Sequence, residues 1–184
     1  MILDDLLKQL GEDEPGVRRA LPPVEKWHPA LSGDIDIQIR ADGSWWHEGA
    51  PFVREKLVRL FASILKREGD EYFLVTPVEK WRIRVEDAPF VVQLISAEGE
   101  GQQQLLNVVT NVGDGFALGP EHPLYMRQDF QGDDVPYVEV RAGLVAKFSR
   151  NAYYQLAEMA LMGEGAGQNL GVWSKGEFFP LEVG

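Results

Sequence analysis

The chain has 184 residues, of which 45% are hydrophobic and 26% are charged, and it contains no cysteine. These values are typical of a soluble globular protein, and the lack of thiols excludes disulfide bonds, thiolate nucleophiles and cysteine-ligated metal centres. Because 29 acidic residues outnumber 18 basic ones, the formal net charge of −11 disfavours binding to nucleic acid and to anionic membranes, which are themselves polyanions.

Residues 1–23 are predicted to form a short amphipathic helix and a linker. Apolar residues recur at helical spacing from Ile2 to Leu10, and the stretch from Glu12 to Pro23 is rich in glycine and proline. The helix is expected to dock on its own chain, on a second copy or on another protein. The first residues are acidic and no apolar run reaches the ~20 residues of a membrane span, so we expect a cytoplasmic protein.

Residues 24–78 are expected to form a first α+β module. Isoleucines alternate with polar residues over 34–40, which predicts a half-buried strand, and Ala41-Asp42-Gly43 is typical of a turn. Pro51 suits the first position of a helix that carries one apolar stripe and ends near Arg67. Gly69-Asp70 would end that helix, and a short apolar strand follows at residues 72–75.

Residues 79–184 are expected to form a second, mostly β module with one helix. The helix is predicted at Arg150–Met162, with Ser149 as its N-cap. Glycine-rich turns separate the strands, and a hairpin around Lys175-Gly176 closes the chain. The strands are predicted at residues 79–85, 90–96, 105–110 and 137–140, with turns at 98–101, 113–115 and 132–134.

The two predicted helices can be aligned with each other. Arg54 then matches Arg150, Leu60 matches Leu156 and Leu65 matches Leu161. Two amphipathic helices can align this well by chance, so duplication and coincidence both stay open. A duplication would place two related modules face to face, and the groove between them would be the natural ligand site.

Three cations stand on one face of the strand that begins the second module. Lys80, Arg82 and Arg84 alternate with apolar residues, which gathers positive charge in an acidic protein. One interpretation is an anion site with charge-assisted hydrogen bonds, and the other is an exposed sheet face balanced by nearby carboxylates such as Glu79 and Asp87.

The matched arginines allow two interpretations as well. A cation in the first turn of a helix opposes the helix dipole, so Arg54 and Arg150 are each expected to have a fixed carboxylate partner or a bound anion. Structural and ligand-binding roles are also both open for four other residues: the aromatic Trp46, the turn residues Thr76 and Asp87, and Asn111. The full set of candidate ligand-binding residues is Trp46, Arg54, Thr76, Glu79, Lys80, Arg82, Asp87, Asn111 and Arg150.

Several blocks of the sequence resemble the bacterial family known as domain of unknown function 1285. Leu74-Val75-Thr76-Pro77-Val78-Glu79-Lys80 is the most specific of them, and together they cover the chain from about Trp27 to its C-terminus. The other blocks are Trp46-His47-Glu48-Gly49-Ala50-Pro51, Arg54, Val85-Glu86-Asp87-Ala88-Pro89-Phe90, Thr110-Asn111, Tyr137–Arg141 and Leu170-Gly171-Val172-Trp173-Ser174-Lys175-Gly176. The resemblance implies two α+β modules with a duplicated core and a C-terminal part loosely similar to pleckstrin-homology-like folds. It also implies a nucleotide-like ligand between the modules and a role in signalling.

No catalytic or metal-binding pattern is present in the sequence. The three histidines, His28, His47 and His122, are scattered and lack the spacing of a zinc site. We therefore expect a non-enzymatic protein without cofactor or metal that binds a small anionic, nucleotide-like ligand at the module interface. Two alternatives stay open. One is an enzyme of hydrolase type using Glu79 with Lys80 or Asp87 in the same groove. The other is an adaptor in which the N-terminal helix and the pleckstrin-homology-like part bind protein partners, and the N-terminal helix is also a possible contact with a second copy.

Overall fold

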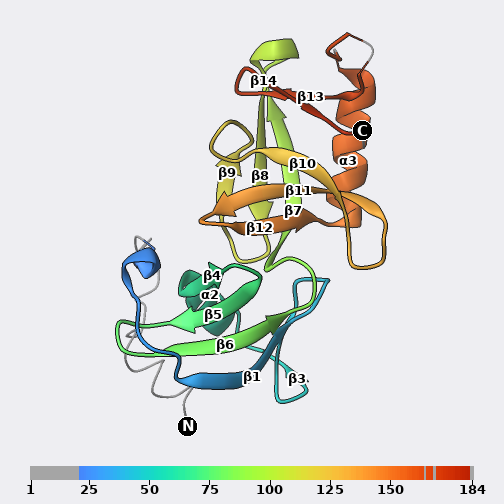
Figure 1. Cartoon of the computed structure of the whole chain (residues 1–184). Coiled ribbons are helices and arrows are strands. Elements are labelled where there is room, and N and C mark those ends of the chain that lie inside the picture. The colour runs from blue at the N-terminus through green and yellow to red at the C-terminus, as the bar shows by residue number, and fades with distance from the viewer. Residues whose placement is uncertain (1–20, 164, 168, 183–184) are drawn as a thin grey trace.

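The computed structural model describes residues 21–163, 165–167 and 169–182 and consists of two sheet-rich modules stacked on each other (Figure 1). The helix predicted at residues 2–10 lies outside the described residues. No described helix is both long enough and apolar enough to cross a membrane.

The N-terminal module is a six-stranded sheet with one short helix. Two antiparallel three-stranded units are joined by a parallel pairing of β1 with β6, which gives the strand order β3-β2-β1-β6-β5-β4. In chain order the elements are η1 (Val24–Lys26), β1 (Gly33–Ile39), β2 (Trp45–His47), β3 (Ala50–Pro51), α2 (Glu55–Ser63), β4 (Leu65–Glu68), β5 (Glu71–Val75) and β6 (Lys80–Val85).

The C-terminal module is a second six-stranded sheet, with the order β10-β11-β12-β7-β8-β9, followed by a helix and a two-stranded hairpin. The helix α3 packs along the side of this sheet against β7 and β12 and also contacts β13 (Figure 1). The elements are β7 (Phe90–Glu98), η2 (Gly101–Gln103), β8 (Leu105–Thr110), β9 (Gly115–Ala117), β10 (Leu124–Gln128), β11 (Asp134–Arg141), β12 (Leu144–Phe148), α3 (Arg150–Met162), β13 (Gly171–Ser174) and β14 (Glu177–Pro180).

The two sheets have the same connectivity. In each, the first and last strands of the module pair in parallel at the centre, and the remaining strands extend outward as antiparallel meanders. The helices do not correspond, because α2 lies between the third and fourth strands of its module whereas α3 follows the sixth. The predicted alignment of Arg54 with Arg150 is therefore wrong, although the sheets themselves repeat.

The helix predicted from Pro51 to Arg67 is shorter in the structure. Pro51 pairs in the edge strand β3, where a missing N–H is tolerated, and the helix begins only at Glu55. Arg67 lies in β4, and Gly69 has a φ of 60° and forms the turn to β5. Helical spacing alone could not distinguish the end of α2 from a strand that follows it after one residue.

The boundary between the modules also differs from the prediction. Residues 80–85 form β6, which pairs with β1 and β5 inside the N-terminal sheet. The modules therefore meet at residues 86–89, the link between β6 and β7, rather than at residue 79. A strand that returns to the centre of an earlier sheet carries no local mark of this in its sequence.

The helix α3 and most turns agree with the sequence. The predicted bounds Arg150–Met162 are those observed, and Ser149 caps the helix by accepting a hydrogen bond from the Ala152 amide at 3.2 Å. The predicted turns at residues 41–43, 98–101, 113–115, 132–134 and 175–176 connect consecutive strands.

Buried apolar side chains of both modules form one continuous core. Polar contacts also cross the junction: the side-chain amide of Asn111 donates to Gly43 O at 3.1 Å, and Arg67 donates to Gly143 O at 2.8 Å. Arg141 reaches back to the helix end at Ala62 O, also at 2.8 Å. The modules are thus packed as one body, and their junction can shape a site.

Candidate functional site

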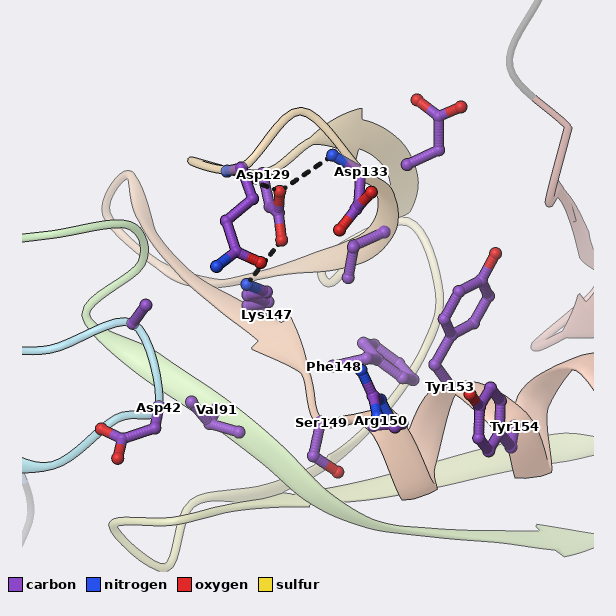
Figure 2. A pocket seen from close by; sticks show the side chains of 14 residues that line it. Asp42, Val91, Asp129, Asp133, Lys147, Phe148, Ser149, Arg150, Tyr153 and Tyr154 are labelled. Carbon is purple, nitrogen blue, oxygen red and sulfur yellow. Dashed lines mark hydrogen bonds and ion pairs between the residues drawn. The ribbon is translucent and has the colours of Figure 1, made fainter.

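A pocket of about 430 Å³ lies where the two modules meet. We refer to it as the junction pocket. The N-terminal module contributes the β1–β2 turn, and the C-terminal module contributes the β10–β11 loop, the end of β12 and the first turns of α3 (Figure 2). It is lined by Ala41, Asp42, Val91, Asp129, Gln131, Asp133, Asp134, Val135, Lys147, Phe148, Ser149, Arg150, Tyr153 and Tyr154.

The β1–β2 turn is held rigidly against the second module. Gly43 has a φ of 85°, and a Cβ at this position would lie 2.7 Å from the Val91 side chain. The neighbouring Asp42 accepts hydrogen bonds from the hydroxyl and the amide of Ser44, which lower the pKa of its carboxyl below 3.8. Asp42 therefore presents a fixed negative charge to the pocket.

A buried polar network forms the wall behind the pocket. Lys147 Nζ lies 3.0 Å from Asp87 Oδ2 and 3.0 Å from Asp129 Oδ2, and the two carboxylates are only 3% and 6% exposed. Arg127 and the Tyr137 hydroxyl also donate to Asp87 Oδ1, at 3.4 and 2.7 Å. We refer to these five side chains as the Asp87 cluster.

Protonation in the Asp87 cluster follows from this geometry. Burial alone would lower the pKa of Lys147, but hydrogen bonds with Asp87 and Asp129 raise it above 10.5. Burial and the hydrogen bond to Asp87 both raise the pKa of the Tyr137 hydroxyl above 10. At neutral pH the lysine is charged and the tyrosine is neutral, so both act as hydrogen-bond donors.

Asp129 also shapes the β10–β11 loop. Its Oδ1 accepts from the amides of Gln131 and Asp133 at 2.8 and 3.0 Å, and its own amide donates to Asp133 O at 2.8 Å. Burial alone would raise the pKa of the Asp129 carboxyl, but the hydrogen bonds from these backbone amides and from Lys147 lower it below 3.8.

This lowered pKa predicts a loss of stability in acid. A carboxyl with a folded-state pKa below its unfolded value stabilises the fold above about pH 4, and the contribution disappears as the pH falls through the folded-state pKa. We expect the free energy of unfolding to fall less steeply between about pH 4 and pH 2 in Asp129→Asn than in the wild type. Urea denaturation at several pH values measures both slopes, and equal slopes would contradict this role of Asp129.

The first turns of α3 form the opposite side of the pocket. Arg150 is exposed at the first helical position, directly after the capping Ser149. One turn further, the rings of Tyr153 and Tyr154 lie 6.4 Å apart at an interplanar angle of 29°, and Tyr154 is 60% exposed. Figure 2 shows these side chains facing the region below the β10–β11 loop. This side therefore offers one cation and aromatic surface.

Of the predicted site residues, Arg150 lines the junction pocket and Asp87 lies in the cluster behind it. Asn111 borders a second pocket of about 400 Å³ that shares the same β1–β2 turn. Its carbonyl accepts from the Val91 amide at 3.0 Å and its amide donates to Gly43 O, so both ends of the side chain hold backbone in place.

The predicted cation stripe on β6 is paired with carboxylates. Lys80 Nζ lies 2.6 Å from Glu68 Oε2, and Arg82 lies 3.1 Å from Asp34 and 3.3 Å from Glu71. The hydrogen bond from Lys80 lowers the pKa of the Glu68 carboxyl below 4.5. The stripe is therefore balanced by carboxylates, as one of the two interpretations expected, but the partners are Glu68, Asp34 and Glu71 rather than the predicted Glu79 and Asp87.

The remaining predicted residues have local roles or lie on the surface. Thr76 is fully buried, and its hydroxyl accepts from the Glu79 amide at 3.0 Å in the β5–β6 turn. The Trp46 ring is covered on one face by Arg40, whose guanidinium carbon lies 3.5 Å from the ring centroid. Arg54 is exposed at the N-cap of α2, directly before the helix rather than in its first turn, where it was predicted. Glu79, the fourth of these residues, is half-buried in the same turn as Thr76, and none of the four is among those that line the junction pocket.

Most residues around the junction pocket were missed in the sequence. Lys147 and Asp129 are separated from Asp87 by 60 and 42 positions along the chain, so no local spacing connects them. The turn residues Gly132-Asp133-Asp134 were recognised only as a connection. Within the described ranges, no group of three histidine, aspartate or glutamate side chains could hold a metal ion.

Comparisons with known proteins agree with this architecture. Residues 22–88 match the family model described as domain of unknown function (DUF1285), N-terminal domain, and residues 89–181 match the corresponding C-terminal domain. The division between the two models falls within the link between β6 and β7. No curated protein matches the chain in sequence.

Two solved structures are similar to this chain. A DUF1285 family protein from Silicibacter pomeroyi DSS-3 is 46% identical, with a TM-score of 0.82 over 89% of this chain and 88% of that chain. A DUF1285 family protein from Shewanella baltica OS155 is 35% identical, with a TM-score of 0.52 over 66% of this chain and 90% of that chain. Because the family models cover both modules and the first of these structures matches nearly the whole chain, this protein belongs to the DUF1285 family.

Proposed function

We propose that this protein is a non-enzymatic binding protein whose small, nucleotide-like ligand carries an anionic group and occupies the junction pocket. The observation that carries the proposal is the composition of this pocket, which both modules line and which joins an exposed arginine to two neighbouring tyrosines. A ligand held there would contact both modules, and this suits a role in signalling or regulation.

The size and chemistry of the pocket support a ligand of this kind. A volume of about 430 Å³ falls within the ~300–1,000 Å³ that small-molecule sites span. Arg150 can donate charge-assisted hydrogen bonds to a phosphate or carboxylate. Tyr154 offers an exposed ring face, and stacking a base on an aromatic side chain contributes about 1–3 kcal/mol.

The engagement of the buried acids supports binding rather than catalysis. A general acid or base must exchange a proton with a bound molecule, but Asp87 and Asp129 are each held by a cation and by further donors. Lys80, the other group considered for catalysis, is paired with Glu68. A hydrolase at this site would have to use the exposed carboxylates of Asp42, Asp133 or Asp134 instead of these buried acids.

The proposal predicts that Arg150→Ala weakens ligand binding. Loss of a charge-assisted hydrogen bond of about 1.5–3 kcal/mol corresponds to a roughly tenfold or greater rise in Kd. A thermal-shift screen against nucleotides and phosphorylated metabolites would find the ligand, because a ligand at 100 times its Kd stabilises the fold by about 2.7 kcal/mol. Calorimetry on the variants would then give the Kd values.

Arg84→Ala is the matched control. Arg84 is a 65% exposed arginine on the outer face of the N-terminal sheet, where it pairs with Asp36, so its loss should leave ligand binding unchanged. Equal Kd values for wild type and Arg150→Ala would contradict the proposal, as would a screen without any stabilising ligand at millimolar concentration.

A second candidate function is protein interaction through the outer face of α3. Tyr154, Leu161 and Met162 are 60%, 73% and 89% exposed on this helix, and exposed apolar groups that cluster on one element favour a contact surface. The occupant tested here is a second copy of the chain. Sedimentation of the wild type beside Leu161→Asp would show a dimer that the charge disrupts, and a monomer at all concentrations would exclude it.

The repeated sheet connectivity supports an origin of the two modules by duplication of one six-stranded unit. We also propose that the C-terminal module is loosely similar to pleckstrin-homology-like folds. The feature that supports this is a sheet with the helix α3 packed along one side. A structural superposition of the two modules on each other would test the duplication, and corresponding side chains in the two cores would support it.

A further inference from the structure

The Asp87 cluster carries no net charge. Asp87 and Asp129 are balanced by Arg127 and Lys147, and the fifth member, Tyr137, is neutral at physiological pH because its pKa is raised. Although Lys147 and Asp129 also line the junction pocket, their charges are directed at each other. A ligand therefore gains little from the charge of either residue.

The other charged residues of the pocket are exposed and unequal in number. Asp42, Asp133 and Asp134 are acidic, whereas Arg150 is the basic residue that stands outside the Asp87 cluster in this lining. Three carboxylates against one guanidinium leave the ligand-facing surface acidic. A ligand with many negative charges would be repelled by the aspartates, even though one anionic group can be held by Arg150.

Asp133 is the best placed of these acceptors. Two hydrogen bonds with Asp129 fix its backbone: the Asp133 amide donates to Asp129 Oδ1 at 3.0 Å, and the Asp133 carbonyl accepts from the Asp129 amide at 2.8 Å. Asp129 is in turn anchored by Lys147. In Figure 2 the Asp133 carboxylate projects from the loop on the side of the pocket opposite the first turn of α3. The pocket therefore has a basic end at Arg150 and, at Asp133, an exposed carboxylate acceptor on a fixed backbone.

We infer that the junction pocket selects a ligand with a single negative charge and a base edge with adjacent N–H donors, as a guanine cyclic monophosphate has, and rejects polyphosphates. This inference rests on the proposed function and specifies its ligand class. The phosphate lies at Arg150, the base stacks on Tyr154, and the donor edge meets the Asp133 carboxylate. A carboxylate accepts two parallel N–H bonds from such an edge, whereas adenine presents one amino group beside an acceptor nitrogen.

Calorimetric titration of the full chain with 3′,5′-cyclic GMP, 3′,5′-cyclic AMP and GTP, without divalent cations, tests the inference. We expect cyclic GMP to bind about tenfold more tightly than cyclic AMP, because one bidentate pair discriminates by about this factor. We expect GTP to bind more weakly than cyclic GMP, and the difference to shrink at high salt because screening weakens the repulsion.

Two variants assign these preferences to residues. Asp133→Asn keeps the size of the side chain but replaces one acceptor oxygen with an NH2 donor, so it cannot accept two parallel N–H bonds and cyclic GMP should lose its advantage over cyclic AMP. Arg150→Ala should weaken both cyclic nucleotides by the same factor. The Asp133 side chain is exposed, so the Asn variant should fold normally, and a melting curve checks this.

The outcomes separate the inference from the proposed function. If none of the three nucleotides binds, the ligand class is overturned, and the proposed function is overturned as well only when the wider thermal-shift screen also finds no stabilising ligand. Two other results overturn the ligand class and leave the proposed site intact, provided that Arg150→Ala still weakens binding. One is tighter binding of GTP than of cyclic GMP, and the other is equal binding of the two cyclic nucleotides. A guanine preference that persists in Asp133→Asn overturns the assignment of Asp133.

Discussion

Asp87→Ala should cost this protein more stability than any surface change. Asp87 is 3% exposed and holds Lys147, Arg127 and the Tyr137 hydroxyl, so its removal leaves a largely buried ammonium with one carboxylate in place of two. Breaking a buried ion pair by removing one partner typically costs about 3–5 kcal/mol. We expect a decrease of this size in the free energy of unfolding, measured by urea denaturation of the full chain.

Asp36→Ala provides the control for this prediction. Asp36 pairs with Arg84 on the outer sheet face, where both side chains are more than half exposed, so the loss should stay within about 1 kcal/mol. If Asp87→Ala and Asp36→Ala lose the same amount of stability, the Asp87 cluster does not anchor the link between the modules.

Gly43→Ala should have the second largest effect, because it acts where the modules touch. The residue has a φ of 85°, and an added Cβ would lie 2.7 Å from Val91 and 2.9 Å from the Asn111 amide nitrogen. Backbone strain and overpacking each cost about 1–3 kcal/mol, so we expect a loss of about 2–4 kcal/mol in unfolding free energy. Ligand binding in the junction pocket should weaken as well, because the neighbouring Asp42 moves with the turn.

Gly49→Ala separates strain from crowding. Gly49 has a similar φ of 78°, but no atom lies within 4 Å of a Cβ built on it. This variant should therefore show only the strain component of about 1 kcal/mol or slightly more, with ligand binding unchanged. Equal losses for the two alanine variants would show that the contact of Gly43 with the second module contributes nothing to stability.

Local signals in the sequence predicted the local parts of the fold. Ser149 marked the start of α3, and the glycines of the 98–101, 113–115 and 132–134 turns marked strand connections, because capping and turn geometry depend on a few consecutive residues. The end of α2 was not predictable in this way. Leu65 continues the apolar stripe of the helix, yet it pairs with Leu74 in the hairpin of β4 and β5.

The candidate site depended on contacts that no local pattern encodes. The sequence placed Asp87 in a turn and left its role open, but its partners come from β10, β11 and β12. The sequence left an anion site and a balanced sheet face both open for the cation stripe on β6, because the balancing carboxylates lie on β1, β4 and β5, whose pairing was unknown. Arg150 was identified for its position in the first turn of a helix, and the structure adds the pocket beside it.

The Asp87 cluster also relates the junction pocket to the link between the modules. Lys147 contacts Asp87 in that link and Asp129 in the loop that lines the pocket. Tyr137 and Ala88 belong to a small second core at the same place. The pocket wall and the link between the modules are therefore stabilised by the same residues. A substitution that displaces the link should also displace the pocket wall.

The most direct test of a ligand site at the junction is a nuclear magnetic resonance titration of the ¹⁵N-labelled full chain with 3′,5′-cyclic GMP. The account predicts that the backbone amides of Asp133, Arg150 and Tyr154 shift together with that of Asp42 from the other module, with one common Kd. Shifts confined to one module, shifts centred on the second pocket around Asn111, or an unchanged spectrum at millimolar nucleotide would contradict it.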